Sequence, residues 1–229
     1  MLLIGRRGYE RFGTELRSLG YDPVALEPVA GLNRIVADHA DTLICDLGGE
    51  FVTSHETAGS LQLEAYRITG RLRTSSDCPY GDYPTDVCFN ALKVGDCLFG
   101  RLASLSDDIK HAAQELGLRL VNVKQGYARC SALPLGAAAV TADRGMLEAL
   151  RGEGIITLLI PAGKIALDGC EYGFIGGASF FDEKRQRAVF FGSLPDEYSD
   201  ELKRFCSRLG VEVVELAGRL TDVGGALVI

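Results

Sequence analysis

The sequence predicts an α/β fold in which five ββαβ units close into a ring, as a fivefold pseudosymmetric propeller. Three observations lead to this prediction. A helix, a glycine and a strand recur at a regular interval, two β-rich runs separate successive helices, and each end of the chain carries part of a unit. The chain has 229 residues, of which 47% are hydrophobic, enough apolar material for one well-packed core. We therefore expect residues 1–229 to form a single domain.

The clearest copy of the recurring unit lies at residues 106–117. Ser106 is a suitable N-cap, apolar residues follow at helical spacing, and Gly117 can adopt the left-handed conformation that ends many helices. Residues 118–123 then have the composition of a strand. The copy around residues 61–70 is the weakest. The glycines that end the five helices are Gly20, Gly70, Gly117, Gly154 and Gly210, on average roughly 47 residues apart, which is a spacing typical of repeat architectures.

Between these units lie pairs of β-rich runs joined by turn residues. The runs pair residues 41–45 with 50–53, 86–90 with 96–99, and 172–175 with 188–191. Gly48 and Gly49, Gly95 and Asp96, and residues 182–184 have the composition of hairpin connections. Each unit is therefore predicted to run strand, turn, strand, helix, strand.

The two ends of the chain supply complementary parts of one unit. Residues 1–26 contain a strand, a helix and a strand without a first hairpin strand, while the last unit stops at Val228 and Ile229, after its hairpin begins, and lacks a helix and a final strand. Together they form a whole unit, so we expect the N- and C-terminal segments to close the ring and to leave no free sheet edge. An open sheet of Rossmann or flavodoxin type is the alternative. It explains alternating helices and strands, but not two strands for each helix, and no G-x-G-x-x-G opens a helix.

Composition limits the classes of partner and cofactor. The formal net charge is −7, and nucleic-acid binding needs clustered positive charge, so we expect no nucleic-acid partner. The seven cysteines contain no CxxC pair, and the three histidines do not flank them at metal-ligand spacing. We predict reduced thiols, no metal and no cofactor. No apolar run is long enough to cross a membrane, and we expect a cytoplasmic protein without a membrane partner.

Five segments together resemble the pentein, or guanidino-group-modifying enzyme, superfamily. Among its branches they are most similar to one of clostridial type, a domain of unknown function with this fold. The segments are His39-Ala-Asp41, Tyr83-Pro-Thr-Asp86 with Asn90, residues 122–131, residues 172–179, and Leu220-Thr221-Asp222. The superfamily includes arginine and agmatine deiminases, dimethylarginine hydrolases and amidinotransferases. Ribosome anti-association factors share its architecture without being enzymes.

The resemblance implies a fivefold ββαβ propeller and a site on its central axis. In the enzymes, a cysteine nucleophile follows a glycine-rich run in the last unit, and a histidine and carboxylates come from other units. Here Gly224 and Gly225 are present, but neither a cysteine nor a histidine follows them. The usual nucleophile is therefore absent from the position that the resemblance indicates.

Polar residues recur at the same phase of the units, where first hairpin strands converge on the axis. Carboxylates can hold a planar guanidinium through paired hydrogen bonds, and a thiol beside a basic residue can act as a nucleophile. We predict Cys130 as nucleophile and His39 as acid/base. The predicted ligand-binding residues are Asp41, Asp86, Asn90, Lys124, Tyr127, Glu171, Tyr172 and Asp222.

Each of these residues also has a structural interpretation. A single cysteine in a strand is commonly a small buried hydrophobe, aspartates often cap turns, and the pairs Gly176-Gly177 and Gly224-Gly225 permit close packing. Three functions therefore stay open. The first is binding of a cationic guanidino or amino-acid-like molecule in an acidic central cavity. The second is a non-enzymatic interaction module, and the third is hydrolase or transferase chemistry that uses Cys130.

Overall fold

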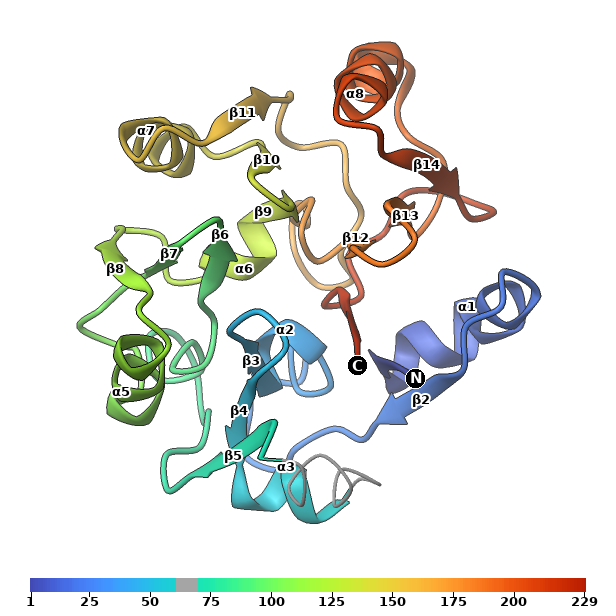
Figure 1. Ribbon diagram of the computed structural model, residues 1–229. Coiled ribbons are helices and arrows are strands. Elements are labelled where there is room, and N and C mark those ends of the chain that lie inside the picture. The colour runs from blue at the N-terminus through green and yellow to red at the C-terminus, as the bar shows by residue number, and fades with distance from the viewer. Residues whose placement is uncertain (61–69) are drawn as a thin grey trace.

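The structure, a computed structural model, describes residues 1–60 and 70–229. Within these residues five three-stranded sheets are arranged in a ring around a central axis (Figure 1). In every sheet the first strand of a unit is antiparallel to the second, and the second is parallel to the third. The predicted fivefold ββαβ architecture is confirmed.

The sheets follow one another along the chain, and the fifth joins its two ends. The first sheet contains β3 (Ile44–Asp46), β4 (Phe51–Ser54) and β5 (Leu72–Ser75), and the second contains β6 (Leu92–Val94), β7 (Cys97–Gly100) and β8 (Arg119–Asn122). The third contains β9 (Ala132–Leu135), β10 (Ala138–Thr141) and β11 (Ile156–Leu159), and the fourth contains β12 (Ser179–Asp182), β13 (Arg187–Phe190) and β14 (Glu212–Glu215). The fifth contains β15 (Ala226–Val228), β1 (Leu2–Gly5) and β2 (Pro23–Leu26).

Helices connect the second strand of each unit to the third and lie at the outside of the ring (Figure 1). They are α1 (Arg6–Ser18), α3 (His55–Ser60), α5 (Asp107–Glu115), α7 (Arg144–Gly152) and α8 (Asp196–Arg208). In α5 the Ser106 side chain accepts a hydrogen bond from the backbone of Asp108, as its predicted N-cap role requires. The five glycines identified from the sequence all have a φ between 72° and 79°, the left-handed conformation that suits glycine. The weakest predicted copy, at residues 61–69, lies outside the described residues.

The two ends of the chain share one sheet, as predicted. Strand β15 is antiparallel to β1, with Leu2 opposite Val228, and β1 is parallel to β2. The Met1 amino group also donates a hydrogen bond to the Ile229 carbonyl, at 3.2 Å. The expectation that closure leaves no free edge is wrong. Each sheet ends at its outer strand, which is the third strand of the unit, as in the partly exposed β8. The ring closes instead through contacts among the inner strands, which are the first strands of the units (β3, β6, β9, β12 and β15).

Four segments predicted as strands have other conformations over all or part of their length. In the run 41–45, residues 41–43 lie in a short helix, and β3 begins only at Ile44. Residues 86–90 form turns and β6 begins only at Leu92, while residues 172–175 precede β12 as an irregular loop. Cys130 lies in the short helix α6 (Ala128–Ser131), which has a counterpart in α2 (Ala40–Leu43). The backbone N–H of Gly173 donates to Ile165 O, and that of Phe174 donates to the Asp222 carboxylate. These donors are therefore used by loop contacts and not by a β ladder.

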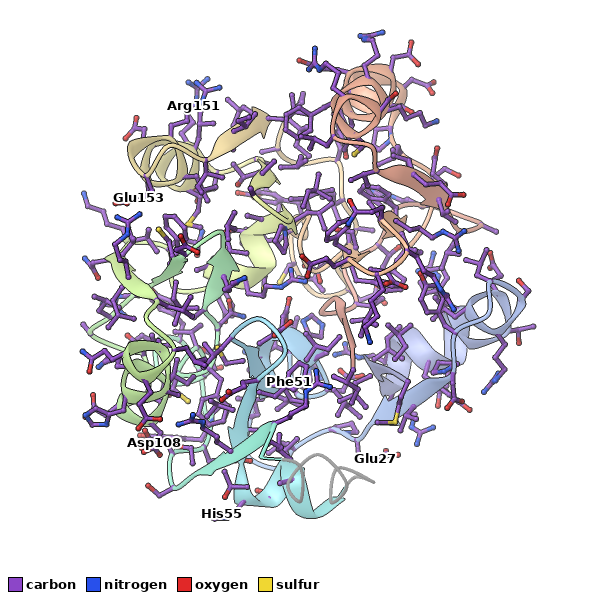
Figure 2. The ribbon with its side chains drawn as sticks, viewed as in Figure 1. Glu27, Phe51, His55, Asp108, Arg151 and Glu153 are labelled. Atoms are coloured by element: carbon purple, nitrogen blue, oxygen red, sulfur yellow. The ribbon has the colours of Figure 1, made fainter. Side chains whose placement is uncertain are left out.

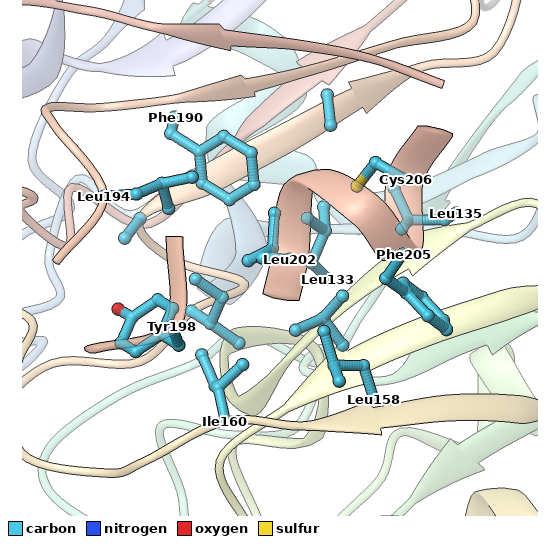
Figure 3. Close-up of a cluster of buried hydrophobic side chains, with 14 of the residues drawn as sticks. Leu133, Leu135, Leu158, Ile160, Phe190, Leu194, Tyr198, Leu202, Phe205 and Cys206 are labelled. Atoms are coloured by element: carbon cyan, nitrogen blue, oxygen red, sulfur yellow. The ribbon is translucent and has the colours of Figure 1, made fainter. Parts of the chain in front are cut away.

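Apolar side chains fill the spaces between neighbouring blades, where a blade is one three-stranded sheet with its helix. Figure 2 shows Phe51 within the ring, whereas the labelled charged residues Glu27, Asp108 and Glu153 lie near its rim. The largest cluster lies between the third sheet (β9 to β11) and the fourth (β12 to β14), and packs one face of α8 against strands β9 to β13 (Figure 3). It includes Leu133, Leu158, Ile160, Phe190, Tyr198, Leu202, Phe205 and Cys206. The apolar side chains are thus buried between blades, and the segments that precede the inner strands lie at the axis.

No helix among the described residues is long and apolar enough to cross a membrane.

Candidate functional site

The segments that precede the five inner strands are joined at the axis by a closed circuit of hydrogen bonds. We call these residues (Asp41, Asn90, Arg129, Cys130, Gly176, Gly177, Gly224 and Gly225) the axial ring. Around the circuit, Asp41 N donates to Gly224 O (3.0 Å), Asn90 Nδ2 to Asp41 O (2.8 Å), Arg129 N to Asn90 Oδ1 (2.8 Å), Gly177 N to Cys130 O (3.1 Å) and Gly225 N to Gly177 O (2.7 Å). All five units therefore contribute to one connected structure, in which backbone donors and acceptors at the axis satisfy one another.

Two glycines of the axial ring make room for buried polar side chains. A Cβ atom at Gly177 would overlap the Asp222 carboxylate, and one at Gly224 would overlap the Cβ and Cγ atoms of His39. Gly224 also has a φ of 79°, which side chains rarely tolerate. The close-packing interpretation of these glycine pairs is thus the one that the structure bears out, and what they pack against is the site itself.

On one side of the axial ring lies a cavity of about 300 Å³, which we call the loop-side cavity. Its wall is built from loops that precede inner strands: Asn33, Ile35, Val36, His39, Tyr127, Cys130, Leu167, Cys170, Glu171, Tyr172, Phe174 and Asp222. Among these described residues there are two carboxylates, Glu171 and Asp222, and neither lysine nor arginine. The volume is at the small end of the range for ligand pockets.

Cys130 and His39 both reach this cavity from buried positions. Asn90 Nδ2 donates a hydrogen bond to Cys130 Sγ at 3.0 Å. Burial raises the pKa of the Cys130 thiol well above its ordinary value, and the nearby Asp41 and Asp222 raise it further. Burial lowers the pKa of His39, although the neighbouring Asp222 opposes that shift. Both groups are consequently neutral in the free protein at neutral pH.

Asp222 and Asp41 form the acidic centre of the site. The Asp222 carboxylate is fixed by two backbone donors, Phe174 N to Oδ2 at 2.9 Å and Gly224 N to Oδ1 at 3.0 Å. Burial raises the pKa of both carboxyl groups, and the proximity of Asp41 adds to the shift of Asp222. Asp41 Oδ2 is buried without a hydrogen-bond partner among the described residues. Arg129 opposes the shift of Asp41 and His39 opposes that of Asp222, so a nearby basic side chain partly offsets the cost of burying each carboxylate.

Aromatic side chains form part of the wall of the cavity and its mouth. The Phe174 ring lies between Tyr127 and Tyr172, with centroid distances of 6.2 and 6.4 Å. The Tyr127 hydroxyl donates to Asp86 Oδ2, and burial, together with this hydrogen bond, raises the pKa of Tyr127. Tyr172 is 40% exposed, which places it at the entrance. These rings can pack on a flat ligand and attract a cation to their faces.

The predicted site residues occupy three different places. Six line the loop-side cavity: His39, Tyr127, Cys130, Glu171, Tyr172 and Asp222. Three are buried around it, namely Asp41 and Asn90 in the axial ring and Asp86 behind Tyr127. Lys124 is exposed and does not line the cavity.

Sequence reasoning missed Phe174 as a ligand-facing residue and Arg129 as a member of the axial ring. Both lie in segments that carried the resemblance, and Arg129 directly precedes Cys130. Both residues lie shortly before an inner strand, and this position was the signal in the sequence that could have indicated their place at the axis. Within the described residues, no cluster of three or more histidine, cysteine or acidic side chains could hold a metal ion.

Comparison with known protein families identifies the family to which the chain belongs. Residues 3–227 match a family of unknown function, DUF6873. The chain belongs to the DUF6873 family. No curated protein matches it in sequence.

Several solved structures are similar to this DUF6873 protein in fold. Dimethylarginine dimethylaminohydrolase from Pseudomonas aeruginosa, as a cysteine-to-serine mutant complexed with citrulline, has a TM-score of 0.59 at 12% identity, covering 94% of this chain and 91% of that one. Inosamine-phosphate amidinotransferase from Streptomyces griseus has a TM-score of 0.53 at 14% identity, covering 96% and 78%. A cyanobacterial arginine dihydrolase has a TM-score of 0.54 at 15% identity, covering 94% of this chain but 36% of its own. The DUF6873 protein therefore has the pentein fold that the sequence resemblance implied.

Proposed function

We propose that this DUF6873 protein binds a small cationic molecule of the guanidino class in the loop-side cavity. One observation carries the proposal. The described cavity wall contains the carboxylates Glu171 and Asp222 and no basic side chain other than the neutral His39. A ligand that brings positive charge would supply the compensation that the site lacks.

The buried carboxylate suits a guanidinium better than a simple ammonium ion. Asp222 is 5% exposed and cannot turn, because two backbone N–H groups hold its oxygens. Each oxygen retains acceptor capacity toward the cavity. A planar guanidinium can occupy two such acceptors at once, which gives geometric selectivity that an ammonium ion cannot match.

The aromatic wall supports the same class of ligand. Tyr127 is held in place by its bond to Asp86, and Phe174 lies between it and Tyr172. A delocalised cation that lies over such rings gains about 0.5–2 kcal/mol from its attraction to them. The structurally similar proteins bear names that refer to dimethylarginine, arginine and amidino transfer, which supports a guanidino compound as the first ligand to test.

The test uses two ligands that differ mainly in charge. In isothermal titration calorimetry at neutral pH, we expect arginine or agmatine to bind, and citrulline, which carries a neutral ureido group in place of the guanidinium, to bind at least about tenfold more weakly. Glu171→Gln should weaken arginine binding by about two- to threefold, since an exposed carboxylate contributes little. Asp222→Asn should weaken it by more than about tenfold, provided that circular dichroism shows a folded protein.

Glu183→Gln is the matched control for Glu171→Gln, because Glu183 is also exposed but lies outside the loop-side cavity. Equal binding of arginine and citrulline, or no binding of any guanidino compound, would contradict the proposal. The second outcome would favour a non-enzymatic interaction module.

A second candidate function is cysteine-dependent chemistry on the same ligand, which the shared cavity of Cys130, His39 and Asp222 favours. The thiol proton would pass to His39, and the thiolate would attack the guanidinium carbon to form a C–S bond. The C–N bond to the leaving amine would then break as His39 returns the proton to that nitrogen. Water would next attack the carbon and give a proton to His39; the C–S bond would then break, and the Cys130 thiolate would take that proton back, which restores both groups.

The raised pKa of Cys130 and the lowered pKa of His39 both oppose the first proton transfer in the free protein. Binding without turnover therefore ranks first. Labelling with chloroacetamidine, read by mass spectrometry, separates the two functions. Catalytic use predicts Cys130 as the fastest-labelled thiol, whereas the binding function predicts that the exposed Cys170 reacts first and that arginine protects it.

A further inference from the structure

A second and larger cavity lies on the other side of the axial ring. It measures about 530 Å³, and we call it the hairpin-side cavity. Its wall includes Gly48 and Gly49, Gly95 and Asp96, Gly136 and Ala137, and Glu183 and Lys184, which lie in or beside the turns that link first and second strands, and residues 226–229. It therefore opens at the opposite end of the inner strands from the loop-side cavity.

Arg129 belongs to the axial ring and lines this second cavity. Its side chain donates only through Nη1, to the carbonyls of Ala132 and Gly176, both at 3.3 Å. A guanidinium has five N–H donors, so those on Nε and Nη2 have no partner among the described residues. No described carboxylate lies within ion-pair distance of this half-buried cation, although Asp41 is near enough for the charge of Arg129 to oppose the rise in its pKa.

Two lysines add positive charge to the same wall. Lys93 and Lys184 line the cavity, and neither has an ion-pair partner in the described part of the chain. Of the carboxylates that line it, Asp46 accepts hydrogen bonds from Gly48 N and Gly49 N, and Asp182 pairs with Arg185. The two others, Asp96 and Glu183, are exposed, where solvent screens their charge. Lys184 is exposed in the same way, so Arg129 and the half-buried Lys93 are the cations of this wall that solvent screens least.

We propose that the hairpin-side cavity binds a small oxyanion, a carboxylate or a phosphate, through the free donors of Arg129 and the ammonium groups of Lys93 and Lys184. Two parallel N–H···O bonds from a guanidinium fit either anion. The site lies across the axial ring from Asp222 and Glu171, and it does not depend on the function proposed for the loop-side cavity.

Titration calorimetry of the full chain with inorganic phosphate and with citrate tests the proposal and distinguishes the two anions. We expect at least one of them to bind, and Arg129→Met to weaken that binding by at least about tenfold. Because Arg129 also supports the axial ring, the double variant Lys93→Met/Lys184→Met provides an independent test at the cavity wall, with an expected loss of about three- to tenfold. The control is Arg204→Met, which removes an exposed arginine of α8 outside the cavity.

Arginine titrations run on the same variants keep the two proposals separate, since failure of one ligand class leaves the other result standing. The anion site would be overturned if neither phosphate nor citrate bound the unmodified protein at millimolar concentration. It would equally be overturned if the double lysine variant and a folded Arg129→Met variant bound the anion as tightly as Arg204→Met does.

Discussion

At the scale of single residues, two glycines shape the site because they have no Cβ atom. Gly177 and Gly224 leave space that the Asp222 carboxylate and the His39 ring occupy. Gly224 combines this close approach with a left-handed backbone, whereas Gly210 has a similar φ of 72° and no atom within 4 Å of a built Cβ. The two positions therefore separate the cost of backbone conformation from the cost of steric overlap.

Gly224→Ala should destabilise the protein by about 2–4 kcal/mol, because backbone strain adds to overpacking against His39. Gly210→Ala should cost only about 1 kcal/mol, from the backbone alone. Urea unfolding of both variants measures the difference. Equal losses at the two positions would show that the contact between Gly224 and His39 does not restrict the site.

The buried carboxyl of Asp41 makes stability depend on pH. Burial raises its pKa above the ordinary value of 3.8, so the folded state binds this proton more tightly than the unfolded state does. Asp41 therefore lowers stability increasingly as pH rises from about 4 through its folded pKa. Its unpartnered Oδ2 is the structural source of that cost.

Asp41→Asn should consequently raise the free energy of unfolding at pH 8, by an amount on the order of 1 kcal/mol. The gain should shrink as pH falls toward 4, where the native Asp41 is protonated and neutral. Urea unfolding at several pH values checks the trend, and Thr42→Val, which removes the hydroxyl 3.5 Å from Asp41 Oδ1, serves as a neighbouring control. A loss of stability that is the same at every pH would contradict the assigned shift.

At the scale of elements, helix ends link the blades to one another. The Asp143 side chain caps α7 through a 2.8 Å bond from Met146 N to Oδ1. Its other oxygen accepts a 3.0 Å bond from Gln125 Nε2, in the loop that leads to α6 and Cys130. The cap of one outer helix thus also anchors the segment that carries the thiol to the axis.

Asp143→Ala should cost about 1–2 kcal/mol in unfolding free energy, because it removes both the cap and the anchor. Asp143→Asn should cost less than about 1 kcal/mol, since asparagine caps helices nearly as well as aspartate. Chemical denaturation of the two variants measures both effects. If the alanine and asparagine variants were equally stable, neither the cap nor the bond to Gln125 would contribute.

Elements with local signals could be predicted from the sequence, and those fixed by distant contacts could not. The helix of residues 106–117 has a cap and an ending glycine within its own segment, and it forms as predicted. Residues 86–90 have strand-like composition, but Asn90 bonds to Asp41 O and Cys130 Sγ, 49 and 40 positions away. Nothing near Asn90 in the sequence indicates those partners.

The candidate site follows the same division. The phase of polar residues relative to the inner strands placed His39, Cys130 and Asp222 at the axis without showing whether they share a cavity, and in the structure all three line the loop-side cavity. It could not indicate which side of the axial ring each residue reaches. Adjacent residues diverge there, since Cys130 lines the loop-side cavity and Arg129 the hairpin-side cavity.

At the scale of the whole molecule, the ring gives the protein two axial cavities of opposite character. The loop-side cavity presents carboxylates and aromatic rings, and the hairpin-side cavity presents Arg129 and Lys93, which have no ion-pair partner among the described residues. Hydrogen bonds between all five units hold the axial ring together, and Arg129 of this ring lines one cavity while Cys130 lines the other. Closure by β1 and β15 completes the axial ring, because Gly224 and Gly225 directly precede β15.

The most direct test of the central claim is a crystal structure of the protein soaked with arginine. We expect a guanidinium in the loop-side cavity, with two of its N–H groups within hydrogen-bond distance of the Asp222 carboxylate. Its plane should lie beside the Tyr127 or Phe174 ring. An arginine bound outside this cavity, or a cavity without ligand density at a saturating concentration, would contradict it.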